Sequence, residues 1–381
     1  MQIFEDNATI SPIYHRALRL TIGKDFAEQQ NGKHQLAPQQ DGEQHNRRRE
    51  LLEVEEETNR TKIIEEYGQS HFKEQMMAQF YARVTKKVNQ EFDNKENLYN
   101  NILQVEDAAA AIMEVLSVKA ASIKRIIPLI QDLPWLADEL INLVNKPQYR
   151  KRADVQVTDA SLAISYIGLD NLKLVVPTFI LKHWLPTTTS PYPVMKRKLW
   201  NEGLSIALAS SVLAEQEGLD AFAGFAAGML SNFGLIAVTR CFVNTYNEIY
   251  KKELREAYET RDKRLHDVMV DFDSSPQLLH EQLLDRSSLI SAEMVELMRF
   301  DRLPITEIMF DLAHTTDIRK MCPLARIITK AKTYVIFRSL AKEDLIDNDE
   351  ALALFSSVKL NQKNIALLKK SDIDHIKLQF K

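Results

Sequence analysis

The chain has 381 residues, of which 45% are hydrophobic and 27% are charged, and its formal net charge is −4. This length predicts about two or three structural units, and the balanced charge excludes a globally basic nucleic-acid binder. With only 10 glycines, the composition indicates an all-α protein without a glycine-rich phosphate loop. Cys241 and Cys322 form no C-x-x-C pair, which excludes a disulfide scaffold or zinc ribbon. We therefore expect reduced thiols and a cytoplasmic location.

The first 104 residues divide into three predicted parts. Residues 1–28 form a short N-terminal segment with scattered apolar positions. The glutamine-rich stretch 29–45 holds very few apolar residues, which predicts a flexible linker. A helical extension, 46–104, follows. It begins with the cluster Arg47–Arg49, which we interpret as the start of a solvated helix rather than a nucleic-acid contact.

An amphipathic helix is predicted inside the helical extension. Its apolar side chains recur every four residues, at Phe72, Met76, Phe80, Val84 and Val88. The resulting stripe needs a partner surface. We expect it to pack on the rest of the same chain, and a coiled-coil or homodimer seam is the alternative.

Residues 105–340 are richer in apolar side chains, and 341–381 form a C-terminal helical tail. Thr158 is predicted to cap one helix and Gly168 to end it. The longest strongly apolar stretch, Leu172–Leu181, is too short to span a bilayer, so no membrane insertion is expected. The predicted helices include Trp135–Val144, Asp159–Ile167, Val194–Gln216, Asp220–Thr239, Phe242–Asp271, Gln277–Asp285, Ser291–Phe300, Ile305–Ala313, Pro323–Leu340, Asp347–Val358 and Gln362–Lys369.

Five sequence patterns now line up along this region. They are DLPWLADELINLVN at 132–145, VQVTDASLAISYIGLD at 155–170, LWNEG at 199–203, AAGMLSNFG at 226–234 and LARIITKAK at 324–332. In this order they resemble the HDOD domain of bacterial signalling proteins, a helical relative of the HD phosphohydrolases. The resemblance covers 105–340. It implies a multi-helix HDOD-like bundle with an HD-like helical core, preceded here by the helical extension.

The resemblance also locates the metal site of the HD enzymes. There, a His, an adjacent His-Asp pair and a later Asp hold divalent metals that activate water against a phosphate ester. These positions correspond to Glu202, to Ser231 with Asn232, and to Lys332 in this sequence. A carboxylate, a hydroxyl, an amide and an ammonium make a poor metal site. The sequence therefore predicts no metal, no cofactor and no enzyme. We expect Glu202 and Lys332 to pair as buried ions instead.

Further positions match the family and are candidates for a pocket or a structural role. Asn145 is expected to close a helix end, and Trp200 to pack in the core. The dipeptide His266-Asp267 is expected on an exposed helix face, because adjacent helical residues converge poorly on one ion. The remaining candidates are Gly168, Gly228, Gly234 and His314.

Three functions remain in competition. The expected one is a non-catalytic regulatory protein that acts in signal transduction through protein partners, with residues 1–104 suited to partner engagement. The alternative is a metal-dependent HD-type phosphohydrolase or phosphodiesterase with a degenerate site. A nucleotide or nucleic-acid sensor would use Arg47–Arg49 or Arg150–Arg152, and the balanced charge disfavours it.

Overall fold

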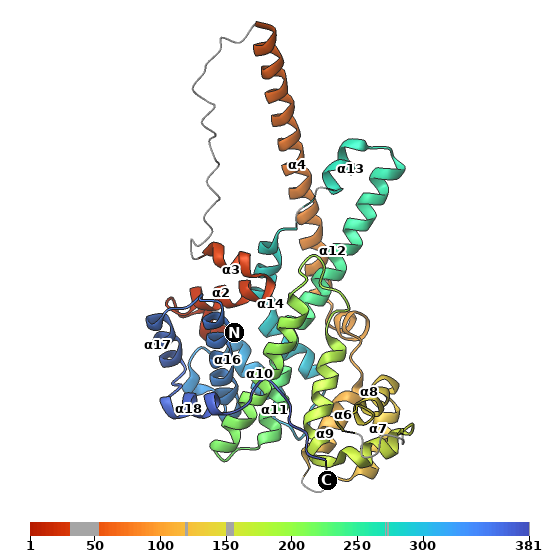
Figure 1. Cartoon of the computed structure of the whole chain (residues 1–381), viewed down its shortest axis with the longest axis vertical. Coiled ribbons are helices and arrows are strands. Elements are labelled where there is room, and N and C mark those ends of the chain that lie inside the picture. Colours follow the sequence, from red (N-terminus) through yellow and green to blue (C-terminus); the bar gives the residue numbers. More distant parts are fainter. Residues whose placement is uncertain (31–52, 119–120, 150–155, 271, 273, 381) are drawn as a thin grey trace.

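The computed structural model describes residues 1–30, 53–118, 121–149, 156–270, 272 and 274–380. Within these ranges the chain is helical and contains no strand, which confirms the all-α fold. Figure 1 shows a helical body with one long helix extending from it. All but the first two residues of the predicted linker, 29–45, lie outside the described residues, as do Arg47–Arg49 and Arg150–Arg152.

The central body is built from helices that begin at clear sequence signals. Prolines stand in the first turns of α8, α14 and α16, where a missing N–H costs no hydrogen bond. The carboxylate of Asp220 caps α11 by accepting from the backbone N–H groups of Phe222 and Ala223. The helices are α6 (Asp107–Ser117), α7 (Ile123–Gln131), α8 (Pro134–Val144), α9 (Ala160–Trp184), α10 (Met195–Gln216), α11 (Ala221–Leu230), α12 (Phe233–Glu259), α14 (Pro276–Leu297), α15 (Ile305–His314) and α16 (Pro323–Lys342).

Helix α9 corrects one capping prediction and refines another. Asp159, not Thr158, is the N-cap, and its carboxylate accepts from the backbone N–H of Leu162 at 2.9 Å. Gly168 has a φ of 76°, so the helix stops there and resumes at once in a new direction. A residue with a side chain adopts this left-handed conformation only with strain, which explains the glycine.

Two predicted helix breaks were wrong. The break expected near Cys241 lies instead at Ser231–Asn232, between α11 and α12, and α12 then continues to Glu259. The predicted gap between 285 and 291 does not exist, because α14 is continuous. The hydroxyl of Ser287 donates to the carbonyl of Leu283 in the same helix, so this serine is accommodated without ending it.

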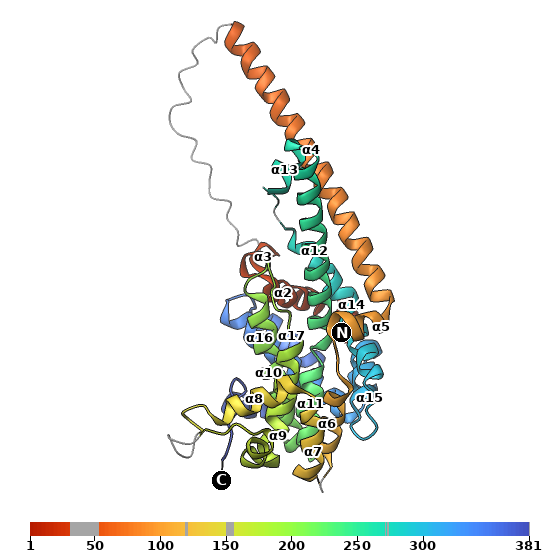
Figure 2. The ribbon, with the colours of Figure 1, turned by 90° about the vertical axis from the view of Figure 1, so that its right-hand side faces the viewer.

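A long helical arm projects from the body. It consists of α4 (Glu53–Asp93), the second half of α12 and the short helix α13 (Lys263–Val270), which lie side by side in Figures 1 and 2. Phe80, Val84 and Val88 are fully buried against the body, which confirms that this part of the apolar stripe packs on its own chain. Within the same stretch of α4, Arg83 pairs with Glu253 of α12 at 2.7 Å. The short α5 (Lys95–Asn97) and the π-helix η1 (Leu98–Leu103) connect α4 to the body.

The N-terminal segment and the C-terminal helical tail meet on the body. Helix α2 (Ser11–Ile22) packs against α10, α14 and α16. Its Arg16 donates to both oxygens of Glu350, at 2.8 and 3.0 Å, and to the backbone carbonyl of Leu345. Glu350 belongs to the capping box of α17 (Asn348–Ser357). The other short helices here are α1 (Gln2–Glu5), α3 (Lys24–Gln30), the 3-10 turn η2 (Ile318–Lys320) and α18 (Gln362–Lys370).

The body contains apolar helices longer than the stretch Leu172–Leu181 that stands out in the sequence. Two described stretches, Ala160–Trp184 and Ala221–Glu259, are long and apolar enough to cross a membrane. The first is α9 and the second joins α11 to α12. Their apolar windows are 56% and 83% buried within the fold, as expected of core helices.

Candidate functional site

The positions that match the HD metal site come together in space. Glu202 on α10, Asn232 at the start of α12 and Lys332 on α16 line one small cavity of about 40 Å³. Ser231 does not join them with its side chain, because its hydroxyl donates to the carbonyl of Gly228 at 2.7 Å. Its backbone carbonyl faces Lys332 instead.

Glu202 is a partly buried carboxylate with one hydrogen-bond donor nearby. The hydroxyl of Thr21 lies 3.3 Å from each of its two oxygens. Burial raises the pKa of Glu202 to about 7, and the charge of Lys198, the Thr21 hydrogen bond and the charge of Lys332 offset only part of this rise. Near neutral pH the group is therefore poised between its neutral and charged forms.

Lys332 supplies the positive charge of the cavity. Its Nζ donates to the carbonyl of Ser231 at 2.9 Å. Burial lowers the pKa of Lys332 to about 8, and the charge of Glu202 raises it in part. No ion-pair contact joins the head groups of these two described residues, although the charge of each shifts the pKa of the other. The two charges act on each other across the cavity rather than in contact.

Asn232 is 1% exposed, and neither its amide nitrogen nor its amide oxygen has a hydrogen-bond partner among the described residues. Such a group is costly to bury unless water or another polar group satisfies it. The cavity beside it has room for a small number of waters.

The N-terminal segment covers this cavity. Tyr14, Leu18 and Thr21 of α2 line it, and the ammonium of Lys198 donates to the carbonyl of Leu20. The sequence patterns of the HDOD region do not connect residues 1–28 with this site. The spacing of 14, 18 and 21 marks one face of a helix, and that face needed a partner surface.

A comparison with protein families identifies this part of the chain. The model of the HDOD domain matches residues 102–275. This region is an HDOD domain. The match includes Glu202, Ser231 and Asn232, whereas Lys332 and His314 lie beyond its end. HDOD domains are related to the HD phosphohydrolases, as the sequence patterns implied.

Two solved structures from Shewanella amazonensis show distant likeness to the chain. The name of one suggests a phosphohydrolase, with 16% identity over 74% of this chain and 92% of the other, at a TM-score of 0.45. The name of the second suggests a metal-dependent phosphohydrolase, with 16% identity over 72% and 98% of the two chains, at a TM-score of 0.38. No curated protein matches the chain. The HDOD assignment therefore stands on the family match.

Two glycines of the HDOD domain allow neighbouring helices to pack closely behind the site. A Cβ at Gly228 would lie 2.8 Å from the hydroxyl of Ser210, so α10 and α11 could not pack as closely. A Cβ at Gly234 would overlap the backbone carbonyl of Ser287 on α14. The N–H of Gly234 also donates to the hydroxyl of Ser291 at 2.7 Å. Both glycines are thus packing positions.

The other family positions of the HDOD domain lie away from the cavity. The Asn145 side-chain amide makes two hydrogen bonds to the backbone of Val157. It donates to the carbonyl at 2.7 Å and accepts from the N–H at 3.0 Å. Asn145 thereby holds the chain after α8 beside the start of α9. Trp200 is partly buried against the core. His314, beyond the domain match, is exposed and stacks on Phe310 at the end of α15.

The residues present do not fit the metal site of the HD enzymes. Among the described residues that line the cavity, Glu202 is the single carboxylate, and the ammonium of Lys332 would repel a divalent cation. Among the described residues, no group of three or more His, Cys, Asp or Glu side chains could hold a metal ion. The side chains of His266 and Asp267 are 38% and 62% exposed on the arm, as expected of a solvated pair.

Proposed function

We propose that this chain is a non-catalytic regulatory protein of the cytoplasm, whose HDOD domain acts in signalling through contacts with a protein partner. The observation that carries the proposal is the hydrogen bond between Lys332 and the carbonyl of Ser231. It places a fixed positive charge among the positions that hold divalent cations in HD enzymes.

The chemistry of hydrolysis explains why an ammonium group in place of a divalent cation matters. An HD enzyme uses its metal to make a nucleophile from water and to stabilise charge on the phosphate. An ammonium is a hydrogen-bond donor with no open coordination position, and so it cannot do the first of these tasks. With a pKa of about 8, Lys332 is mostly charged at neutral pH and opposes a cation.

The cover formed by α2 supports the same proposal. A cavity of about 40 Å³ is far below the roughly 300–1,000 Å³ of ordinary ligand sites. This small cavity cannot hold a phosphate ester while α2 stays in place. That helix is held by the bidentate contact between Arg16 and Glu350 and by the bond from Lys198 to Leu20.

The helical arm is the surface that we propose for the partner protein. It projects from the body, and it carries exposed apolar side chains at Tyr258 (75% exposed) and Val270 (58% exposed). Exposed apolar groups on a projecting helix pair are typical of helix-mediated recognition.

A metal and turnover measurement tests the absence of catalysis. Purified full-length protein, with and without added Mn²⁺, is assayed for bound metal and for hydrolysis of bis-p-nitrophenyl phosphate, next to Glu202→Gln. We expect less than stoichiometric metal and the same background rate for both proteins. Metal-dependent turnover that is lost in Glu202→Gln would establish the phosphohydrolase alternative instead.

A crosslinked pull-down tests the partner surface. Deleting residues 1–104 would strip α2 from the body, so point substitutions on the full chain are preferable. The double variant Tyr258→Ser/Val270→Ser removes the exposed apolar groups of the arm, and Leu162→Ser/Leu352→Ser removes two similarly exposed groups elsewhere. We expect one discrete partner that is lost only with the arm variant. Equal capture by both variants, or no partner at all, would contradict the assignment.

A further inference from the structure

A second and larger cavity adjoins the one just described. It measures about 520 Å³ and lies between α10 and α16, and Glu202 stands in the wall of both cavities. The two tail residues Asp374 and His375 form part of its rim. This volume is within the range of ordinary small-molecule sites.

Four cationic side chains line this larger cavity from two facing helices. Arg197 and Lys198 come from the first turn of α10, and Arg338 and Lys342 from the last turns of α16. Residues 338 and 342 are one helical turn apart, so they lie on the same face of α16. The helices thus present positive charge to the cavity from opposite sides.

The carboxylates of the cavity leave part of this charge uncompensated. Asp374 is engaged by Arg338 at 2.7 Å, Glu343 pairs with Lys24 at 2.8 Å, and Glu202 interacts with the charge of Lys198. Within the described part of the chain, neither Arg197 nor Lys342 has an ion-pair partner. Their charges are therefore available to an anion.

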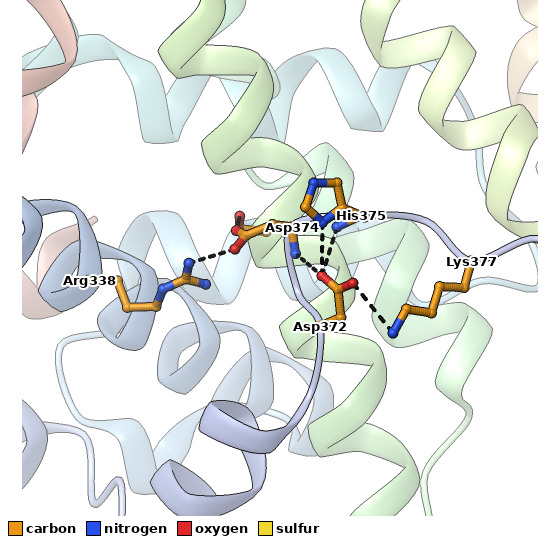
Figure 3. A network of polar contacts seen from close by, with 6 residues as sticks. Arg338, Asp372, Asp374, His375 and Lys377 are labelled. Carbon is orange, nitrogen blue, oxygen red and sulfur yellow. Dashed lines mark hydrogen bonds and ion pairs between the residues drawn. The ribbon is translucent and has the colours of Figure 1, made fainter.

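A polar network fixes one of the cations in place. As Figure 3 shows, Asp372 accepts from the backbone N–H groups of Asp374 and His375, each at 3.2 Å, and also contacts the ring of His375 and the ammonium of Lys377. This turn holds the carboxylate of Asp374 against Arg338. A guanidinium held by one carboxylate keeps other N–H donors for a second oxyanion.

We propose that this cavity binds a small molecule carrying a diphosphate group, through Arg197, Lys198, Arg338 and Lys342. Several converging cations suit a polyanion better than a single carboxylate, and guanidinium groups match phosphate oxygens in pairs. The inference goes beyond the proposed function, because it gives the HDOD protein a chemical input. The shared chemistry is the diphosphate, whether it is free or part of a nucleotide.

Calorimetric titration of the full chain with inorganic pyrophosphate and with ADP tests this site. The variant Arg197→Gln/Lys342→Gln removes the two unpaired charges, and Lys363→Gln/Lys370→Gln removes two exposed charges of α18 as a matched control. We expect Kd to rise at least about 10-fold in the cavity variant, because each lost charge-assisted bond weakens binding. The control should bind like the unaltered chain.

The two probes separate the sources of the diphosphate. Much tighter binding of ADP would assign the site to nucleotides, and equal binding would assign it to the diphosphate alone. Absence of heat with both probes, or the same Kd in both double variants, would overturn the proposal. Analysis of the ADP recovered after titration distinguishes the proposed diphosphate site from the proposed non-catalytic function. Intact ADP agrees with both, whereas hydrolysed ADP would support this site and contradict a non-catalytic protein.

Discussion

The hydroxyl of Thr21 lies 3.3 Å from both carboxylate oxygens of Glu202, across 181 positions of sequence. This contact joins the N-terminal helix α2 to the position that the sequence patterns match to the first metal ligand of the HD enzymes. Glu202 is thereby part of the interface that holds α2 on the body.

Thr21→Val should remove the only side-chain hydrogen bond made to Glu202 by a described residue. We expect a loss of about 1.5 kcal/mol in the free energy of unfolding above pH 7, where the carboxylate is charged, and a smaller loss at pH 5. Thr178→Val is the control, because the Thr178 hydroxyl donates only to Leu174 in its own helix. Urea unfolding followed by circular dichroism gives both values. A pH-independent difference between the variants would contradict this role.

Glu202→Gln should change how stability depends on pH. The pKa of Glu202 is raised from 4.5 to about 7 in the fold, so between these values the folded state binds more protons than the unfolded state. Its contribution to stability is therefore lost as pH rises through this window. As pH rises from 5 to 8, the free energy of unfolding of the Gln variant should increase relative to that of the unaltered chain, by up to about 3 kcal/mol. Glu215→Gln, on the exposed face of the same helix, should show no such gain.

His280 should have the opposite effect. It is 1% exposed on α14 and stacks edge-on against His15 and Phe26 of the N-terminal segment. Burial, together with the nearby charges of Arg19 and His15, lowers its pKa from 6.5 to about 4. The unfolded chain then binds the extra proton, so stability falls as pH drops from about 6.5 to 4.

His280→Leu should remove this acid sensitivity. We expect the variant to retain up to about 3 kcal/mol more of its neutral-pH stability at pH 4.5 than the unaltered chain. The exposed His314→Gln serves as the control. Thermal or urea unfolding at pH 7 and pH 4.5 provides the comparison, and parallel losses in all three proteins would show that His280 is not the source.

Gly234→Ala should destabilise the fold by more than about 3 kcal/mol, because the new methyl group would overlap the Ser287 carbonyl and drive α12 away from α14. Gly68→Ala is the matched control. Gly68 lies inside the exposed part of α4, with no atom within 4 Å of the added Cβ, so the change should stabilise the helix by about 0.5–1 kcal/mol. Similar effects at both glycines in urea unfolding would refute the close approach of these helices.

The helical character of the chain could be predicted because it depends on local spacing and composition. The sequence patterns also direct attention to Glu202, Asn232 and Lys332, which line one cavity in the fold; their correspondence to the metal site of the HD enzymes stays a prediction. The breaks at Ser231–Asn232 and the continuity of α14 were missed, because they depend on how α12 and α14 cross at Gly234. The cover formed by α2 was missed for the same reason, since it is a contact between residues far apart in sequence.

The contact between Arg16 and Glu350 spans 334 positions of the chain, and it sets an order of assembly. During synthesis, α2 leaves the ribosome long before α17 exists to hold it. Contacts between residues so far apart in sequence form late, because closing a long loop loses chain entropy before the stabilising contacts are made. The contact that fixes α2 beside Glu202 can therefore form only after α17 has emerged.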